Sequence, residues 1–241
     1  MAKTFQVDTG GTLTTNLVSY YKLEDVNDFW ASYNLTNNNS VAFNTGKVNN
    51  AADFGASNTN KSLTIADNLG IDGGNCSLSA WVNVTTAPTS GNYMVLVSQY
   101  SDTSSKVAYQ IAYFNDAGTL KLLFGRERVA VAADRIYYTT TLTTGNWYHL
   151  AITYDGTNLR AYYNGSLVES PIAASGNGAG TRSSLLSVGV AYTAVNDFYS
   201  GLVDEFGVWS KALSATEITD LYNSGNGQTM IEGFIPQVII I

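Results

Sequence analysis

The chain has few of the residues on which common catalytic and cross-linking chemistry depends. Its 241 residues include one cysteine, Cys76, and one histidine, His149. A single cysteine excludes an intrachain disulfide, and a single histidine without a cluster of metal ligands leaves few ways to build a zinc or nucleophilic site. We therefore expect no Ser-His-Asp triad, and we interpret Cys76 as a small buried residue and His149 as a packing residue.

Basic residues are also scarce. Twelve Lys and Arg against 19 Asp and Glu give a formal net charge of −7 and a pI near 4.5. Because nucleic acids and anionic membranes are bound through clustered Lys and Arg, we expect neither as a partner. No apolar run is long enough to span a bilayer, and Met1–Asp8 lacks the apolar segment of a secretory signal peptide.

The residues that are plentiful indicate an all-β chain. Only 3 prolines and 13% charged residues accompany 22 glycines and many asparagines, a composition typical of tight turns between short strands. Hydrophobic residues make up 45% of the chain, enough for a sizeable core. Residues 147–154 and 159–163 alternate as strands do, and Asn164-Gly165 follows as the best hairpin turn, because a type I′ turn needs positive φ at both positions.

The segment Gly201–Gly225 begins with a strand pattern. Leu202, Phe206 and Val208 repeat with a period of two. Asp204 falls in the same row, which predicts an unusual inward carboxylate.

The same segment continues into a helix start. Ser214 and Glu217 have the spacing of a capping box, in which each side chain bonds the other residue's backbone amide. An apolar stripe follows, so we expect one short helix near residues 214–224, which Gly225 can end.

This closing segment resembles that of LamG-like jelly-roll domains, in the concanavalin A-like lectin/glucanase superfamily. Four other segments resemble further blocks of the family in the same order: Leu17–Asp25, Gly46–Ile65, Ser77–Val84 and Gly145–Val168. The resemblance spans roughly residues 17–226. One departure is the segment Val26–Tyr33, where the family usually has a short acidic, Ser/Gly-rich loop.

The resemblance implies a two-sheet antiparallel β-sandwich of the concanavalin A-like jelly-roll type. We expect residues 1–16 to form an N-terminal arm or edge strand, residues 17–228 the LamG-like domain, and residues 229–241 an apolar C-terminal tail. A free tail of this kind would aggregate. We therefore expect it to pair as a strand, either on its own sandwich or on a neighbouring subunit.

The resemblance also implies one structural calcium ion, because LamG-like domains often hold one near their opening and closing strands. The candidate ligands are Glu24, Asp25 and Asp204. Calcium takes six to eight oxygens from carboxylates, carbonyls and water. The alternative is that these carboxylates only cap loops or accept hydrogen bonds from backbone amides.

Loop aromatic residues are the candidates for ligand binding, because sugar sites combine aromatic faces with polar hydrogen bonds. Most tyrosines are expected to pack within strands, where tyrosine is favoured. The loop candidates are Trp30, Tyr33, Tyr100, Tyr192 and Tyr199. The charge cluster Arg126–Arg128 is interpreted as a solvated turn, and the alternative is a clamp for a polar ligand.

Glycoside hydrolysis, as in the superfamily's glucanases, needs two carboxylates that flank the sugar. Asp204 and Glu205 are consecutive, which predicts side chains on opposite faces of a strand. We therefore expect no enzyme activity.

The expected function is a non-catalytic surface recognition or structural module. The resemblance to domains that work outside the cell, the absence of a secretion signal, and the short arm and apolar tail favour a phage virion protein. Such a decoration, fibre or tail-associated protein would lie on the virion surface and contact glycan or other virion proteins. The alternative is a carbohydrate-binding, lectin-like module of a secreted adhesin or carbohydrate-active enzyme, located outside the cell or on its surface.

Overall fold

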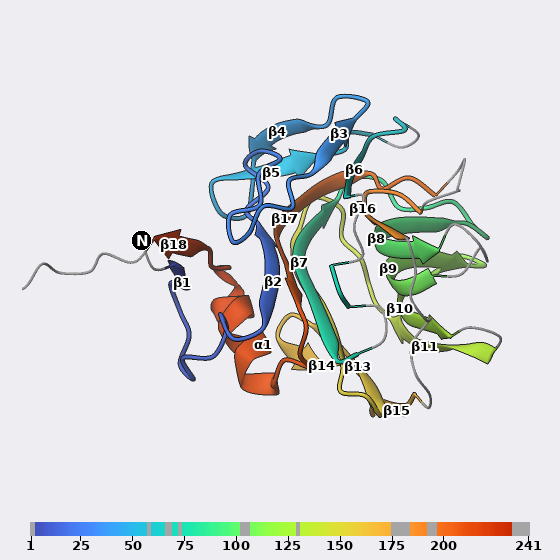
Figure 1. Cartoon of the computed structure of the whole chain (residues 1–241). Helices are drawn as coiled ribbons and strands as arrows, with labels where there is room; N and C mark the ends of the chain where they lie inside the picture. The colour runs from blue at the N-terminus through green and yellow to red at the C-terminus, as the bar shows by residue number, and fades with distance from the viewer. Residues whose placement is uncertain are drawn as a thin grey trace, which may run out of the picture.

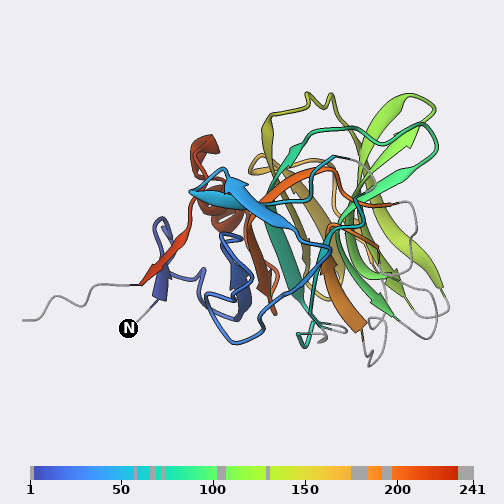
Figure 2. The ribbon, with the colours of Figure 1, turned by 90° about the horizontal axis from the view of Figure 1, so that it is seen from above.

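The computed structural model describes residues 3–56, 59–65, 69–71, 74–101, 107–128, 131–174, 184–191 and 197–232. Two large antiparallel sheets face each other, as Figures 1 and 2 show. The predicted antiparallel β-sandwich with one short helix is thereby confirmed. Within the described residues, no helix combines the length and the apolar character needed to span a membrane.

Among the described residues, the first large sheet has seven strands. In spatial order they are β11 (Val131–Thr139), β10 (Thr119–Arg128), β9 (Val107–Asp116), β8 (Tyr93–Ser101), β16 (Ser184–Val188), β6 (Ser62–Ile65) and β3 (Thr36–Asn38).

The second large sheet has nine strands in the part of the chain that the structure describes. Seven lie in the order β14 (Ser166–Leu167), β13 (Asn158–Tyr163), β12 (Trp147–Tyr154), β7 (Cys76–Val84), β17 (Gly201–Trp209), β5 (Asn50–Asp53) and β4 (Ala42–Thr45). The remaining two are β15 (Ile172–Ala173), which pairs with β13, and β2 (Leu17–Tyr21), which pairs with β17. At the β13–β14 hairpin, Asn164 and Gly165 have φ values of 49° and 78°, which confirms the predicted turn.

The main hydrophobic core lies between the two large sheets. Leu78, Ala80 and Val82 of β7 point into it, because alternate residues of a strand share a face. Val97 and Phe124 meet them from the seven-stranded sheet.

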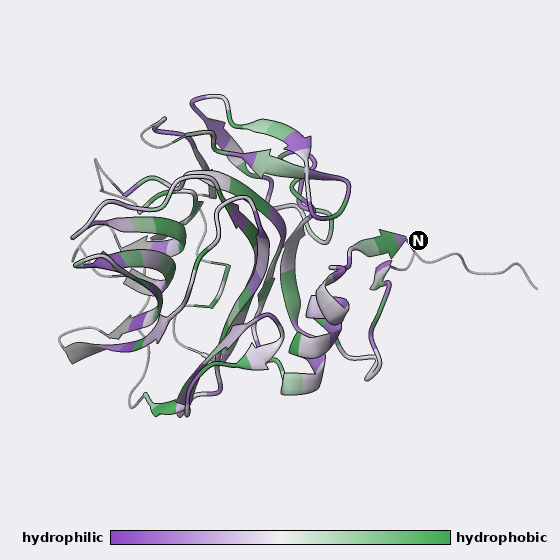
Figure 3. Ribbon diagram, turned by 180° about the vertical axis from the view of Figure 1, so that it is seen from behind, coloured by the Kyte–Doolittle hydropathy of each residue, from purple (hydrophilic) through white to green (hydrophobic). Residues whose placement is uncertain are grey.

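A second hydrophobic cluster covers the outer face of the nine-stranded sheet. Tyr20 and Trp209 contribute from β2 and β17, and Ile218 from helix α1 (Ala215–Tyr222). Phe5 and Met230 contribute from two terminal strands, β1 (Lys3–Phe5) and β18 (Met230–Glu232). Figures 1 and 3 show that the helix and these strands lie together on one side of the sandwich.

The two terminal strands pair antiparallel with each other in a separate two-stranded sheet. The beginning of the predicted tail is therefore paired with the arm of the same chain and not with a strand of the large sheets. Residues 233–241 lie outside the described residues. The domain boundaries expected at residues 17 and 228 stay predictions.

Helix α1 begins with the predicted capping box. Ser214 Oγ accepts from the Glu217 amide at 3.2 Å, and Glu217 Oε2 accepts from the Ser214 amide at 2.8 Å. The expected end at Gly225 was wrong for the α-helix, because Asn223 is its C-cap, with a left-handed φ of 47°. A 3₁₀ turn, η1 (Asn223–Gly225), follows.

Strand β17 contains a β-bulge at Glu205, whose φ of 50° is left-handed. The register with β7 shifts between Asp204 and Gly207. One extra residue in a strand reverses the alternation beyond it. Phe206 points into the core, and so does Val203, which lies before the bulge.

This bulge overturns two predictions. Asp204 does not lie in an inward row with Phe206, because the alternation that predicts this row is broken between them. The Asp204 and Glu205 side chains do not point to opposite faces either. Both lie on the outer face, where Glu205 meets Tyr20 and Asp204 meets the turn at Lys47.

Candidate functional site

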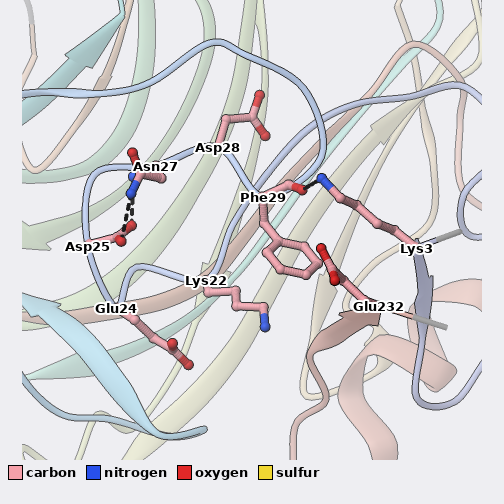
Figure 4. A pocket seen from close by; sticks show the side chains of 8 residues that line it. All are labelled: Lys3, Lys22, Glu24, Asp25, Asn27, Asp28, Phe29 and Glu232. Atoms are coloured by element: carbon pink, nitrogen blue, oxygen red, sulfur yellow. Dashed lines mark hydrogen bonds between the residues drawn. The ribbon is translucent and has the colours of Figure 1, made fainter. Parts of the chain in front are cut away.

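A pocket of about 300 Å³ lies between the terminal strands and the segment Lys22–Tyr33, which we call the opening loop. Figure 4 shows its lining: Lys3, Lys22, Glu24, Asp25, Asn27, Asp28, Phe29 and Glu232. We call it the opening-loop pocket. It brings together residues from both ends of the described chain, because β1 and β18 pair beside the loop.

Asp28 organises the opening loop. The residue is 7% exposed, and its carboxylate accepts hydrogen bonds from Ser19 Oγ (2.7 Å) and from the amides of Tyr20 (3.1 Å), Trp30 (2.9 Å) and Tyr33 (3.2 Å). A carboxylate with several amide donors closes a loop in one conformation, since each bond satisfies a backbone group without a strand partner. These hydrogen bonds therefore hold the loop in a defined conformation, although its sequence departs from that of the family's usual loop.

Phe29 provides the aromatic surface of the pocket. Lys22 Nζ lies 4.0 Å and Lys3 Nζ 4.9 Å from its ring centroid, and Lys3 also donates to the Phe29 carbonyl. Such cation–π contacts hold a lysine over a ring while its remaining donors stay available. Figure 4 shows the Phe29 ring beside the two lysines, with Glu232 among the other lining residues.

Carboxylates and an amide supply the other polar groups. Glu24 Oε1 accepts from Asn49 Nδ2 at 2.7 Å, and Asp25 accepts from the Asn27 amide and from Asn27 Nδ2, both at 2.7 Å. Two lysines and four carboxylates line the pocket, which gives a formal charge of −2. The pocket therefore presents both donors and acceptors with a negative balance.

The outer-face carboxylates of β17 are buried beside this region. Asp204 is 0% and Glu205 5% exposed. Asp204 Oδ2 accepts from the amides of Lys47 (2.8 Å) and Val48 (2.9 Å), while Glu205 Oε2 accepts from the Tyr20 hydroxyl. Burial raises the pKa of Asp204 to about 7, and burial together with the adjacent Asp204 raises that of Glu205 well above its usual value.

The three predicted calcium ligands do not form one set. Glu24 lies near Asp204 across the Gly46–Asn49 turn, whereas Asp25 is bonded to Asn27 on an exposed part of the loop. Within the described ranges, no three His, Cys, Asp or Glu side chains gather closely enough to hold a metal ion. Asp204 Oδ1 is buried without a hydrogen-bond donor, which suits a cation, but it is a single oxygen where calcium needs six to eight.

The predicted ligand-binding aromatic residues are dispersed. Trp30 and Tyr33 belong to the opening loop, with Trp30 packed against the outer-face cluster and Tyr33 38% exposed. Tyr192 and the side chain of Tyr100 lie outside the described residues. Tyr199 is fully buried.

Tyr199 is a core residue and not a surface contact for a ligand. Its ring packs edge-on against Phe54 with centroids 5.8 Å apart, and its hydroxyl donates to the Leu202 carbonyl at 3.2 Å. The sequence does not reveal this, because Tyr199 follows a loop-like stretch yet packs between the sheets.

His149 and Cys76 are buried, as the sequence indicated, whereas Arg126 differs from the expectation. His149 is buried, shares a 2.8 Å hydrogen bond with Ser79 through Nε2, and has a pKa lowered to about 3 by burial, which agrees with packing. Cys76 is buried and its pKa is raised to about 12 by burial. Arg126 is not in a solvated turn: it is 1% exposed and its guanidinium lies 3.9 Å from the Tyr154 ring centroid.

Sequence reasoning missed several residues of the opening-loop pocket, among them Lys3, Lys22, Phe29 and Glu232. Lys3 and Glu232 are far apart along the chain, and only the pairing of β1 with β18 unites them. Phe29 had one available signal, since it lies in the segment Val26–Tyr33 that departs from the family pattern.

Solved structures with similar folds are numerous. Domain 4 of AbnA, a GH43 extracellular arabinanase from Geobacillus stearothermophilus solved in complex with arabinotriose, superposes with a TM-score of 0.65 at 18% identity, over 86% of this chain and 98% of that one. The binding domain of botulinum neurotoxin serotype G gives a TM-score of 0.64 at 18% identity, over 86% of this chain and 50% of that one. The binding domain of botulinum neurotoxin DC in complex with SialylT gives a TM-score of 0.66 at 14% identity, over 87% of this chain and 52% of that one.

These similarities show the fold, and this chain spans about half the length of the neurotoxin binding domains. No curated protein matches the sequence. The family Laminin_G_3, described as the concanavalin A-like lectin/glucanases superfamily, matches residues 54–219, which is more than half of the chain. The chain therefore belongs to this family of lectin-like domains.

Proposed function

We propose that the chain is a non-catalytic glycan-binding module and that the opening-loop pocket holds the sugar. The proposal rests on one observation: the Phe29 ring lies in the same pocket as lysine donors and carboxylate acceptors. Sugars present apolar C–H faces and hydroxyls that both donate and accept, so they suit a site of this composition. The volume of about 300 Å³ is at the lower end of the range for small-ligand pockets, so we infer one or two sugar units.

The charge of the pocket favours a neutral glycan. Its formal balance of −2 arises from four carboxylates against Lys3 and Lys22. An acidic sugar would bring another negative charge close to these carboxylates, and like charges at short range repel. Hydroxyls of a neutral sugar can instead accept from the lysines and donate to Glu24 and Glu232.

Two of the structural neighbours support sugar binding as the type of function. The arabinanase domain was solved with arabinotriose and one neurotoxin binding domain with SialylT. Each ligand is known only for the protein with which it was solved. At 14–18% identity, the similarity does not indicate which residues of this chain would bind a sugar.

The state of Asp204 and Glu205 supports the absence of hydrolysis. A glycosidase needs two carboxyl groups that reach the sugar from either side. Here both groups are buried. The Asp204 carboxylate accepts hydrogen bonds from the amides of Lys47 and Val48, and the Glu205 carboxylate accepts one from the Tyr20 hydroxyl. Because of the bulge, both side chains lie on the same face of the sheet. We therefore propose no catalytic role for them because they are buried, and not because they point in opposite directions.

A glycan array with neutral and sialylated oligosaccharides tests the proposal. We expect the protein to bind neutral glycans, and Phe29→Leu and Lys22→Met to weaken the binding. Tyr137→Ala is the matched control, because Tyr137 is an exposed aromatic residue, 37% accessible, on β11 of the other large sheet. Binding that survives both pocket substitutions, or no binding to any neutral glycan, contradicts the proposal.

A second candidate function is attachment to a larger assembly, for which we propose the surface of a phage virion as a decoration, fibre or tail-associated subunit. The observation that favours assembly is the β1–β18 sheet, which among the described residues has only two strands and therefore two open edges. The alternative setting is a secreted adhesin or carbohydrate-active enzyme. Mass spectrometry of purified native particles tests the virion role: the chain is expected among their proteins, and its absence contradicts the role.

A further inference from the structure

A second hollow of about 510 Å³ lies on the sandwich between the β13–β14 hairpin and the start of helix α1. Its apolar lining includes Tyr162 and Leu167 of the hairpin and Leu213 and Ala215 at the helix start. We call it the β14 groove. Leu167 is 46% exposed, the highest value among the large hydrophobic side chains exposed in the described residues.

The groove adjoins an open sheet edge. Strand β14 ends the strand order of the nine-stranded sheet, and within the described part of the chain it pairs only with β13. An edge strand exposes unpaired N–H and C=O groups that can accept another strand. Apolar pockets beside such an edge select alternate side chains of the added strand, which is the arrangement of β-strand addition.

We propose that the β14 groove receives the apolar segment Gly233–Ile241 of a second copy of this chain. Six of these nine residues are Phe, Ile or Val, and none has a charged side chain. Four consecutive β-branched residues, Val238–Ile241, follow Pro236 and Gln237, so this part keeps the N–H groups that a strand ladder requires. Because β14 has two residues and offers few backbone bonds, the apolar groove supplies most of the affinity.

The direction of β18 favours a second copy over the same chain. Figures 1, 2 and 3 show the arrow of this strand pointing away from the sandwich. Nine further residues reach at most about 30 Å when fully extended. The described chain therefore ends pointing away from its own sandwich, which favours a groove on a second copy over the groove of the same chain.

The groove also suits this occupant by charge. The ionic groups in its lining are Asp155 and Arg160, which pair with each other at 2.5 Å. A neutral apolar segment therefore needs no counter-ion there, whereas a charged peptide would compete with an existing ion pair. The proposal deepens the assembly candidate and does not depend on glycan binding.

The test measures the mass of the full chain in solution by light scattering, beside a chain truncated after Glu232 and the Leu167→Asp variant. We expect the full chain to self-associate, and each variant to associate at least about tenfold more weakly. Mixing the two variants should restore a 1:1 complex, because the Leu167→Asp chain has an intact tail and the truncated chain an intact groove. Tyr137→Asp, on the other sheet, should associate like the parent.

Several results would overturn the proposal. These are a full chain that stays monomeric, a Leu167→Asp chain that associates as the parent does, or folded variants that fail to form the mixed complex. A monomer whose tail cross-links to its own groove also contradicts the second-copy arrangement. Glycan binding is measured on the same truncated chain, so a failure of assembly and a failure of the sugar site are distinguished.

Discussion

The Tyr20 hydroxyl donates a hydrogen bond to the Glu205 carboxylate on the outer face of the nine-stranded sheet. The two residues come from neighbouring strands, β2 and β17, and both are buried; Tyr20 packs in the outer-face cluster with residues of the terminal strands and helix α1. The bond is possible only because Glu205 forms the β-bulge and turns towards this face. It ties the opening strand to the closing strand next to the opening-loop pocket.

This contact predicts different outcomes for two conservative substitutions. Tyr20→Phe removes the donor and leaves a buried carboxyl without it, so the free energy of unfolding should fall by about 1–3 kcal/mol. Glu205→Gln keeps an acceptor and removes a like charge beside Asp204, so it should cost less than Tyr20→Phe. Urea denaturation of the two variants measures the difference, and equal losses would contradict the role assigned to the hydroxyl.

His149 predicts a pH dependence with a definite sign. Its folded pKa of about 3 lies below the unfolded value of about 6.5, so the unfolded chain takes up the proton first as the pH falls. The stability contributed by the neutral ring is complete above pH about 6.5 and is lost towards pH 3. By pH 4.5 the parent should lose roughly 2–3 kcal/mol more than His149→Gln.

Comparing denaturation of the parent and His149→Gln at pH 7 and pH 4.5 checks this prediction. Asp204 and Glu205 have raised pKa values and act with the opposite sign, but both proteins contain them and their effect cancels in the comparison. Parallel losses in the two proteins would exclude the buried histidine as the cause.

Gly207 predicts a steric effect next to the bulge. A Cβ at this position would lie 2.3 Å from Trp209 Cη2 and 3.2 Å from Tyr20 Cδ2. Gly207→Ala should therefore destabilise the fold by about 1–3 kcal/mol, as overpacking of a dense core does. Gly74→Ala is the control, since nothing lies within 4 Å of its added Cβ. Thermal melting of both variants decides the matter, and similar melting temperatures would count against tight packing at Gly207.

Calcium binding stays a prediction; of its three candidate ligands, Glu24 lies near Asp204 and Asp25 does not. A divalent cation would offset the repulsion among Asp204, Glu205 and Glu24, and an ion that binds only the folded chain adds about 2.7 kcal/mol at 100 times its Kd. We expect millimolar calcium to raise the Tm of the parent and of Asp25→Asn, but not of Asp204→Asn. An unchanged Tm for the parent would end the prediction.

The sequence predicted those parts of the fold that depend on local chemistry. Ser214 and Glu217 are three residues apart, so their capping box needs only the backbone between them. The Asn164-Gly165 turn likewise needs only two residues that tolerate positive φ. The opening loop was recognised as a departure from the family pattern, but nothing local indicated that Asp28 would hold it closed.

The arrangement of the candidate site residues depends on features that strand alternation in the sequence does not predict. The bulge at Glu205 changes which side chains share a face, and no residue type marks it, because Glu is not a residue that favours left-handed φ. Tyr199 was expected at the surface and lies in the core, since burial is decided by which sheets cover a residue.

By itself, the sequence determined the all-β class, the family, the helix start and the hairpin turn, because strand alternation, caps and turns act over a few residues. Only the tertiary structure decided that Lys3 and Glu232 line one pocket with Phe29, and that Asp204 and Glu205 are buried on the same face. These relations join residues far apart along the chain or depend on a single-residue shift of register. They are selected by the packing of the whole sandwich, which no local pattern records.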